Sequence, residues 1–463
     1  MIQGTTTRFI TGGIRGTAFD ILKIDANIPP IDLLLRKIQA KAASRICALT
    51  PNHPLHSLTC RTSSHFVHSH KSPLHYLFFT TGFKPTPIET ISATRCCPTY
   101  LPTMRTIISF NKEDALIFAN IAHNNMKYKV YCNSSGFEGG ISAAVVLYDN
   151  NWIIKTLQLH PGTATEHTVY ELELTGILLT LHLLSLLMKQ ITNTIIVGLD
   201  NQAAIQSLYT QNPRPSHYLL DQIHSAAEHL HSHQDHIQWR RELQRARCAR
   251  QHLHIRTSEV CDLWIHWVPG HLDCEPNKKA DELAKEAAKG ESSAQADLPA
   301  FLCKTLPTSL IALHQETNCK MQRKWKRCWK ESPRYSCLGS IDVSTPSKKW
   351  LNLVKPLTRK QASILMQLRS GHVGLNKYLH KIRSSNTPNC PDCNENTPET
   401  IHHFLFECTN YNHEQAILHR TLQRKLHELS YLLSNPTATL PLLKFIHTTG
   451  QLKQTLGPIT TDA

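Results

Sequence analysis

Three acidic residues and one asparagine occupy positions from which their side chains can converge on divalent cations. Asn133 and Asp200 each end a predicted strand, and Glu173 and Asp281 lie in the first turns of predicted helices. Strand ends are where α/β sheets place ligands. Magnesium prefers carboxylate oxygens, and two such ions about 3.5–4 Å apart can activate water and stabilise the leaving oxygen of a phosphodiester. A fold that does this chemistry needs three or four carboxylates on separate elements with their tips together, and Mg²⁺ or Mn²⁺ would be the ions.

Each acid also has an ordinary structural interpretation. Glu173 can be a solvated charge on a helix, Asp200 can be an N-cap, and Asp281 can be an acid favoured by the helix dipole. Glu171 competes with Glu173, but it lies two residues away and so about 200° round the helix. The spacing alone leaves these alternatives open.

The elements that position these residues follow from hydrophobic periodicity. Strands are predicted at 127–133, 141–148, 152–159, 194–200 and 263–268, and helices at 168–189, from 201, at 216–233 and at 277–289. The first of these helices buries Leu174, Leu178, Leu181 and either Leu184 or Leu186. Three antiparallel strands followed by alternating helices and strands predict an α/β (α+β) fold, a mixed five-stranded sheet with flanking helices. A mainly helical C-terminal region follows.

Four segments carry a specific resemblance. They are VYCNSSGFEGG, TVYELELTG, VGLDNQAAI and IHWVPGHLDCEPNKKADELAKEA, spread in order over about 160 residues. They resemble the type 1 ribonuclease H blocks of non-LTR retrotransposons. The resemblance implies that Asn133, Glu173, Asp200 and Asp281 take the four metal-ligand positions. It also implies that His271 is the flexible-loop histidine, and that the activity is hydrolysis of the RNA strand of RNA–DNA hybrids.

The first of these positions departs from the family pattern. The family has an aspartate where this chain has Asn133, and usually a glycine where it has Ser134. Asn133 is isosteric with aspartate but neutral, so the site loses one charge from a cluster that must hold two dications. We therefore expect weak or absent cleavage, and a catalytically inactive nucleic-acid-binding protein is the alternative.

A second cluster predicts zinc. Cys390-x2-Cys393-x9-His403-x4-Cys408 presents three thiolates and an imidazole, the ligands that favour a closed tetrahedral zinc site. His402 competes with His403. The segment CPDCNENTPETIHHFLFECTNY resembles the zinc-binding element near the C-terminus of many non-LTR retrotransposon proteins, and its His-Phe-Leu favours His403. Free thiols in a helical hairpin are the alternative.

The N-terminal residues resemble the segment that follows the polymerase in fungal-type non-LTR reverse transcriptases. The chain is thus expected to be the C-terminal part of such a polyprotein. The predicted divisions are 1–60, a remnant of the post-polymerase helical segment; 61–124, a linker; 125–290, the ribonuclease H-like domain; 291–385, a basic helical region; 386–412, the zinc-binding element; and 413–463, a helical tail.

Two basic stretches are candidates for nucleic-acid contact. Arg240, Arg241 and Arg245 belong to a long arginine-rich stretch over 234–262 that is either a handle for phosphates or a solvated insertion. Lys324, Lys326 and Arg327 surround two tryptophans that either stack on bases or pack in a core.

The overall composition agrees with a polyanionic partner. The net charge of +15 favours nucleic acid, because Lys and Arg gain affinity by releasing counterions from phosphates. Fifteen scattered cysteines and no secretory signal predict a reducing, intracellular compartment, nucleus or cytoplasm. The longest apolar run, 176–188, is too short to span a bilayer, so no membrane partner is expected. No small-molecule cofactor is evident.

Overall fold

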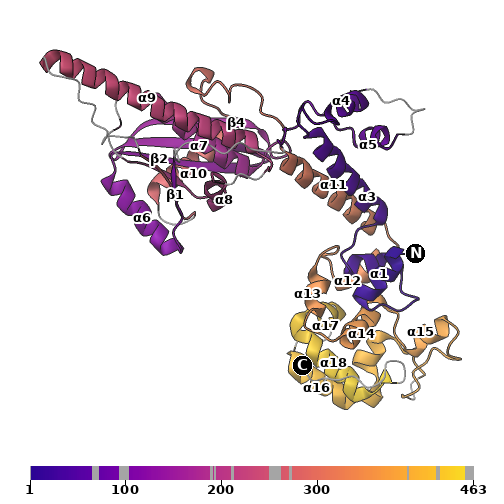
Figure 1. Cartoon of the computed structure of the whole chain (residues 1–463). Coiled ribbons are helices and arrows are strands. Elements are labelled where there is room, and N and C mark those ends of the chain that lie inside the picture. Colours follow the sequence, from indigo (N-terminus) through magenta and orange to yellow (C-terminus); the bar gives the residue numbers. More distant parts are fainter. Residues whose placement is uncertain are drawn as a thin grey trace. The chain divides into compact units, whose positions relative to one another are not determined.

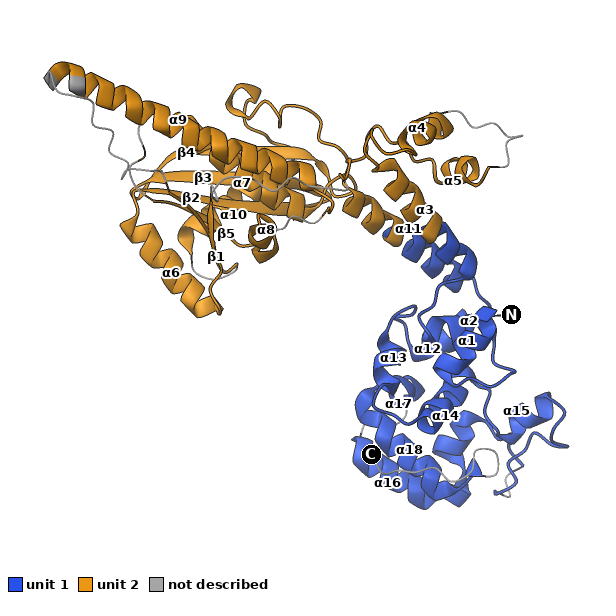
Figure 2. Ribbon diagram, in the orientation of Figure 1, with its two compact units in different colours: residues 1–37, 319–463 blue, residues 38–318 orange. Residues whose placement is uncertain are grey.

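The computed structural model describes residues 2–64, 72–92, 104–187, 191, 194–209, 213–249, 262–270, 274–393, 396–423 and 428–453. The chain forms two compact units (Figure 2): residues 38–318, and residues 1–37 together with 319–463. Helices α3 (Ile31–Cys47) and α11 (Leu310–Lys330) each contribute residues to both units. Within the described residues, no helix is both long and apolar enough to cross a bilayer.

A six-stranded mixed sheet organises the unit of residues 38–318 (Figure 1). Its strands are β1 (Arg105–Ile107), β2 (Tyr128–Phe137), β3 (Gly140–Asp149), β4 (Trp152–Thr163), β5 (Ile195–Leu199) and β6 (Leu263–Trp267). Their spatial order is β1-β6-β5-β2-β3-β4. The β2–β3 and β3–β4 pairs are antiparallel, whereas β2–β5, β5–β6 and β1–β6 are parallel. The mixed α/β fold predicted from the sequence is thus confirmed, with one more strand than expected.

Helices cover both faces of this sheet. The helices of the unit, besides α3 and α11, are α4 (His56–Ser64), α5 (Pro73–Thr81), α6 (Lys112–Asn125), α7 (Val169–Ser185), α8 (Gln202–Ser207), α9 (His217–Ala249), α10 (Glu275–Ala287) and the short 3₁₀ turn Gln295–Asp297. Strand residues alternate between the faces. Val130 and Cys132 join the core under α7 and α9, whereas Tyr131 packs with Ala119 of α6 and Ala280 of α10.

The sixth strand and the helix after it lie in the range that we predicted to be a linker. Residues 61–124 contain α5, β1 and α6, and β1 extends the sheet by pairing with β6. Two features hide this structure from the sequence. β1 has three residues, too few to show a period of two. Helix α6 buries only alanines, at Ala115, Ala119 and Ala122, so its apolar stripe is weak.

Helix α7 carries most of the apolar core beside the sheet. A capping box starts it: the Thr168 hydroxyl accepts from the Glu171 amide, and Glu171 Oε2 accepts from the Thr168 amide. Of the two alternatives for its last buried leucine, Leu184 is buried and Leu186 is 44% exposed. Burial of one leucine side chain stabilises the fold by about 1.5–3 kcal/mol. The buried leucines of α7 therefore stabilise its packing against β2 and β3.

The other unit is helical. Its elements, besides its parts of α3 and α11, are α1 (Ile2–Thr11), α2 (Phe19–Asp25), α12 (Tyr335–Ile341), α13 (Lys349–Val354), α14 (Arg359–Ser370), α15 (Asn376–Lys381), the π-turn η2 (His403–Glu407), the 3₁₀ turn η3 (Thr409–Tyr411), α16 (Asn412–Leu422), α17 (Leu429–Ser434) and α18 (Pro436–Thr449). One core joins Ile21 and Leu22 of α2 to Leu365 of α14 and Leu442 of α18.

This shared core joins residues from segments that the sequence predicts as separate divisions. Residues 1–37 do not stand apart from the C-terminal third, because an ion pair that is almost completely buried links them. Arg369 Nη2 lies 2.9 Å from Asp25 Oδ1, and Ser363 Oγ donates to the Gly12 carbonyl at 2.6 Å. The basic helical region, the predicted zinc-binding element and the tail all contribute residues to this core.

Candidate active site and metal cluster

Side chains alternate between the two faces along β2, so Asn133 and Ser134, the two departures from the ribonuclease H pattern of the resemblance, point to opposite faces of the sheet. Asn133 shares the face of Tyr131, on which α10 packs, and Ser134 shares the face of Cys132, on which α7 packs. Both residues are buried. Asn133 Oδ1 accepts from the Ser134 amide at 2.8 Å, so the asparagine side chain is held by the adjacent backbone.

Glu173 reaches Ser134 because α7 approaches β2 closely. A β-carbon added at Gly176 would lie 3.1 Å from Cys132 Cβ, so the glycine permits this approach. One turn earlier on the same helix, Glu173 Oε1 accepts from the Ser134 hydroxyl at 2.5 Å. The sequence indicated a departure at Ser134 but not this contact, which depends on the register of α7 on β2.

Glu173 is a buried carboxyl with one free oxygen. Its side chain is 2% exposed, and Oε2 has no hydrogen-bond partner in the described part of the chain. Burial, and secondarily the charge of Asp200, raise the pKa of Glu173 to about 8, while the bonds from Ser134 act in the opposite direction. A carboxyl in this environment favours a proton or a cation near its free oxygen.

Asp200 follows the end of β5, as predicted, and it does not act as an N-cap. The N-cap of α8 is Asn201, whose Oδ1 accepts from the Ala204 amide at 3.2 Å. The Asp200 carboxylate faces Gly270, where an added β-carbon would lie 3.2 Å from Oδ2. The charge of Asp200 also contributes to the raised pKa of Glu173.

Asp281 lies on α10, which packs on β2 and β3. The helix begins at Glu275, so Asp281 is beyond its first turn and gains little from the helix dipole. Its Oδ2 pairs with Lys285 Nζ at 2.5 Å. Within the described residues, the ligand atoms of Glu173, Asp200 and Asp281 do not all come within 4.8 Å of one another. His271 lies outside the described residues.

Glu171, the competitor of Glu173, has a structural role. Oε2 caps the start of α7, and burial together with the nearby charge of Glu89 raises the pKa of the Glu171 carboxyl to about 7. Glu89 itself accepts from the amides of Ser216 at 2.5 Å and Leu310 at 2.7 Å. The bonds between Glu171 and Thr168 hold Glu171 at the start of α7, whereas Glu173 reaches Ser134 of β2.

The four predicted zinc ligands form one buried cluster. Cys390, Cys393, His403 and Cys408 offer ligand atoms that all lie within 4.8 Å of one another. Cys390 Sγ lies 3.8 Å from Cys408 Sγ, and Cys393 Sγ lies 3.4 Å from His403 Nε2. Tetrahedral zinc with Zn–S of about 2.3 Å and Zn–N of about 2.05 Å requires S–S near 3.8 Å and S–N near 3.5 Å. The cluster therefore has the dimensions of a zinc site.

The structure distinguishes His403 from His402. His403 is 2% exposed and directs Nε2 at Cys393, whereas His402 is exposed and pairs with Glu407. Glu407 Oε2 also lies 3.8 Å from His403 Nδ1, on the side of the ring away from the thiols. A carboxylate behind a ligating histidine orients the ring, as is common around zinc.

A second set of ligand atoms overlaps this cluster. Cys390, Asp392 and Glu399 also gather within 4.8 Å. Their carboxylates already accept hydrogen bonds, however: Asp392 from the Tyr411 hydroxyl at 2.9 Å, and Glu399 from the Asn376 amide at 2.5 Å. The cluster of three cysteines and one histidine is therefore the better zinc site.

The arginine-rich stretch continues α9 as a helix to Ala249 (Figure 1). Arg240, Arg241 and Arg245 are exposed, and Arg245 pairs with Glu242 at 2.9 Å. Trp239 is 46% exposed and stacks on His236. The first part of the predicted insertion is therefore helical, and residues 250–261 lie outside the described residues.

The second basic stretch places its tryptophans in a core. Trp325 and Trp329 are 2% and 3% exposed, so the packing alternative holds and neither ring is open to a base. On the same helix, Lys326 and Arg327 are exposed and Lys324 is half-buried. These three residues can contact nucleic acid only through their charge.

The sheet unit thus has three antiparallel strands, then a helix, then parallel strands separated by helices on one mixed sheet. Among solved structures, the chain is similar to ribonuclease H1 from the halophilic archaeon Halobacterium salinarum NRC-1, at 15% identity and a TM-score of 0.23, over 35% of this chain and 98% of that one. No family model and no curated protein matches the sequence.

Proposed function

We propose that the ribonuclease H-like domain binds RNA–DNA hybrids and cleaves their RNA strand only weakly. The observation that carries this proposal is the contact between Ser134, inside β2, and Glu173 of α7. A neutral Asn133 occupies the first ligand position, and the adjacent Ser134 hydroxyl donates to Glu173 Oε1 at 2.5 Å. The site thus lacks one carboxylate, and a second carboxylate shares an oxygen with a protein donor.

The donor set fits divalent cations only in part. Glu173, Asp200 and Asp281 would supply carboxylate oxygens, and the free Oε2 of Glu173 supports a cation on that side. Asn133 adds an amide oxygen without charge, so the set is short of the negative charge that two dications need. When bound, Mg²⁺ or Mn²⁺ would polarise the phosphodiester and activate water. The residues of this chain would orient the phosphate, and His271 would assist proton transfer or product departure.

The principal alternative is a module that binds nucleic acid without cleaving it. Its support is the same Asn133, together with the charge of +15 and the exposed arginines of α9. For the cysteine cluster we propose a structural zinc. We also propose, from the sequence resemblance, that the chain derives from a non-LTR retrotransposon protein.

A cleavage assay separates the two functions. Purified chain is incubated with a labelled RNA–DNA hybrid and Mg²⁺ or Mn²⁺, beside Asn133→Asp and Asn133→Asp/Ser134→Gly. We expect little cleavage by the wild type, a rise of about tenfold or more with Asn133→Asp, and a further rise when Ser134 no longer engages Glu173. Asn133→Asp/Glu173→Gln is the control and should lose the gain. Wild-type cleavage at ordinary ribonuclease H rates would contradict the proposal.

The arginines of α9 are tested by the salt dependence of hybrid binding. Each phosphate contact that is lost lowers the slope of log K against log salt by about 0.9. Arg240→Gln/Arg241→Gln/Arg245→Gln should therefore lower the slope by about 2–3. The matched control is Lys84→Gln/Lys112→Gln/Lys304→Gln, three exposed lysines elsewhere in the same unit. An equal change in both variants would mean that only net charge matters.

A further inference from the structure

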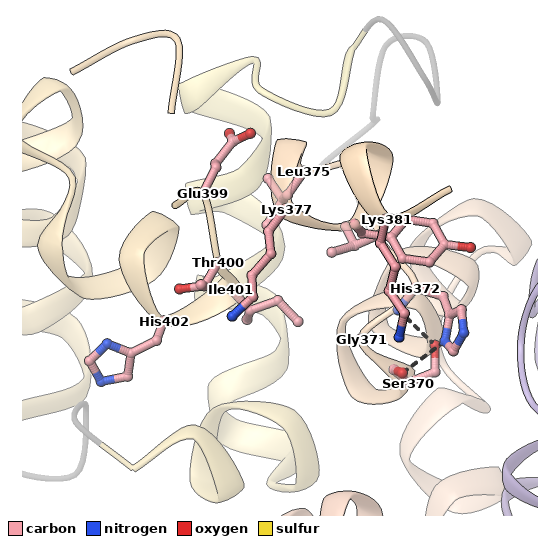
Figure 3. Close-up of a pocket in the computed structure, with 12 residues that line it drawn as sticks. Ser370, Gly371, His372, Leu375, Lys377, Lys381, Glu399, Thr400, Ile401 and His402 are labelled. Atoms are coloured by element: carbon pink, nitrogen blue, oxygen red, sulfur yellow. Dashed lines mark hydrogen bonds between the residues drawn. The ribbon is translucent and has the colours of Figure 1, made fainter. Parts of the chain in front are cut away.

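A pocket beside the cysteine cluster carries chemistry that neither the ribonuclease H resemblance nor the zinc prediction uses. It has a volume of about 420 Å³ and is lined by residues of the segment 370–381, which includes α15, and by residues 399–402 of the predicted zinc-binding element (Figure 3). Its walls include His372, Lys377, Tyr378, Lys381, Thr400 and Ile401. Pockets of about 300–1,000 Å³ accommodate small ligands, and a single nucleotide is within this range.

The pocket carries two lysine ammonium groups that no carboxylate of the described residues pairs with. Lys377 and Lys381 are one turn apart on α15, and neither ammonium has an ion pair among the residues that the structure describes. Figure 3 shows both side chains extending from α15 in the same direction, while the Glu399 carboxylate points away from them. That carboxylate accepts from the Asn376 amide and from Gln451 Nε2. The two ammonium groups are therefore available to an anion.

An aromatic pair forms the wall beside the lysines. The rings of His372 and Tyr378 meet edge to face, with centroids 5.1 Å apart and an interplanar angle of 71°. The Ser370 carbonyl lies 2.9 Å from His372 Nδ1 and accepts from it, which fixes the ring. Both rings are half-buried, so part of each remains accessible. Aromatic rings next to basic side chains bind single-stranded nucleic acids by stacking and charge.

The pocket is built on a fixed frame. Asn376, the first residue of α15, donates its side-chain amide to the Asn389 carbonyl at 2.9 Å and its backbone amide to Glu399 Oε2 at 2.5 Å. Glu399 lies between the cysteine pair and His403 in the sequence. The zinc-binding element therefore positions the lysines, and a preformed anion site loses less entropy on binding.

We propose that this pocket binds one nucleotide of a single-stranded nucleic acid. Lys377 and Lys381 contact its phosphate, and the base lies against His372 and Tyr378. A base in a duplex is stacked and paired, so only a single strand or an unpaired end can place a base on this wall. The site is separate from the ribonuclease H-like domain, and its function does not depend on cleavage.

The first test measures binding of the full chain to a fluorescein-labelled 12-nucleotide single-stranded RNA by anisotropy. Lys377→Ala/Lys381→Ala should weaken binding about tenfold. The matched control, Lys348→Ala/Lys355→Ala, removes two exposed lysines of the same unit that lie outside the pocket and should change the affinity less than twofold. Equal weakening of both variants, or no weakening of the first, would overturn the proposal. Zinc content and thermal unfolding verify that each variant folds.

The second test asks whether the base takes part. The wild type should bind the RNA at least about fivefold more tightly than the same backbone without bases, because stacking adds to the phosphate contacts. Tyr378→Leu should abolish this preference. If Tyr378→Leu does not fold, His372→Ala serves as the test variant in its place. Equal binding of both strands, or release of the RNA by low millimolar inorganic phosphate, would reduce the site to a simple anion site and contradict the nucleotide proposal. None of these results depends on hybrid cleavage, so the two proposals fail separately.

Discussion

Removal of Arg369 should weaken the helical unit. Its side chain is 1% exposed, and it donates to Asp25 Oδ1 at 2.9 Å and to the Leu433 carbonyl at 2.8 Å. Its guanidinium also lies over the Trp350 ring, 4.9 Å from the centroid. The two charges cost free energy to bury, and their attraction offsets that cost in part: burial raises the pKa of Asp25, while Arg369 acts in the opposite direction. Removing one partner leaves the other buried and uncompensated.

We therefore expect Arg369→Met to lower the free energy of unfolding by about 3–5 kcal/mol. Urea unfolding followed by tryptophan fluorescence measures this change, since Trp350 lies beneath the guanidinium. Arg359→Met is the control: Arg359 is exposed and donates to the carbonyls of Arg8 and Ile10, so its loss should cost about 1 kcal/mol or less. A loss below 1 kcal/mol for Arg369→Met would mean that Asp25 takes up a proton when folded.

His266 should make the sheet sensitive to acid. Burial in β6 lowers the pKa of this histidine to about 4, and its ring packs against Phe118 and Tyr131. In the unfolded chain the pKa is about 6.5, so below that pH the unfolded state binds more protons. Stability is therefore present above pH 6.5 and is lost as the pH falls towards 4.

Between pH 7 and pH 5 this residue should account for about 2 kcal/mol of lost stability. Denaturant unfolding at the two pH values should show a smaller difference for His266→Phe than for the wild type. His236→Phe, at an exposed position on α9, should leave the difference unchanged. If His266→Phe has the same acid sensitivity as the wild type, the loss arises elsewhere.

Two features of the candidate active site, the position of Asp200 and the bond between Ser134 and Glu173, differ in how far the sequence could predict them. The position of Asp200 after β5 was predictable, because an apolar run ending in an acid before a polar helix start fixes it. The bond between Ser134 and Glu173 was not, because it joins residues 39 apart and depends on how closely Gly176 lets α7 approach β2. The bond itself depends on tertiary packing.

At the scale of elements, periodicity predicted the long strands and α7 and missed what is short or weakly patterned. β1 has three residues, and α9 continues beyond the expected His233 to Ala249 without an apolar stripe. The polar length of α9 explains the error. The C-terminal part of a helix that extends beyond the sheet has no face to bury. Its sequence is therefore rich in charged residues and lacks the apolar residues every 3.6 positions that mark a packed helix.

The zinc-binding element offers a direct test of its ligands. His403→Ala should reduce bound zinc from one equivalent towards zero, whereas His402→Ala should retain it, because only the His403 ring faces Cys393. Metal analysis of the purified chain after dialysis measures the stoichiometry. In structural sites the metal supplies folding free energy, so His403→Ala should also lower the unfolding midpoint. Equal zinc in both variants would contradict the assignment.

At the scale of the whole molecule, two ends of the sequence build one unit and the middle builds the other. Residues 1–37 and 319–463 share a core that includes Ile21, Ile24, Leu365 and Leu442. Residues 38–318 have a separate core around the sheet. The resemblance predicted that the N-terminal segment is a remnant. Its hydrogen-bond partners among residues 319–463 lie 312 to 351 residues away, so no local sequence pattern reveals them.

This arrangement predicts how fragments behave. Residues 38–318 should unfold cooperatively by themselves, since their core is complete. Residues 319–463 alone should lack a cooperative transition, because without α2 they lose Ile21, Leu22 and Ile24 from their core and leave Arg369 without Asp25. Adding a peptide of residues 1–37 should restore the transition, and the peptide with Asp25→Ala should restore it poorly. Near-UV circular dichroism on heating measures each mixture. If residues 319–463 unfold at the midpoint of the full chain without the peptide, the N-terminal segment is not part of that core's stability, and the buried pair contributes less than its burial implies.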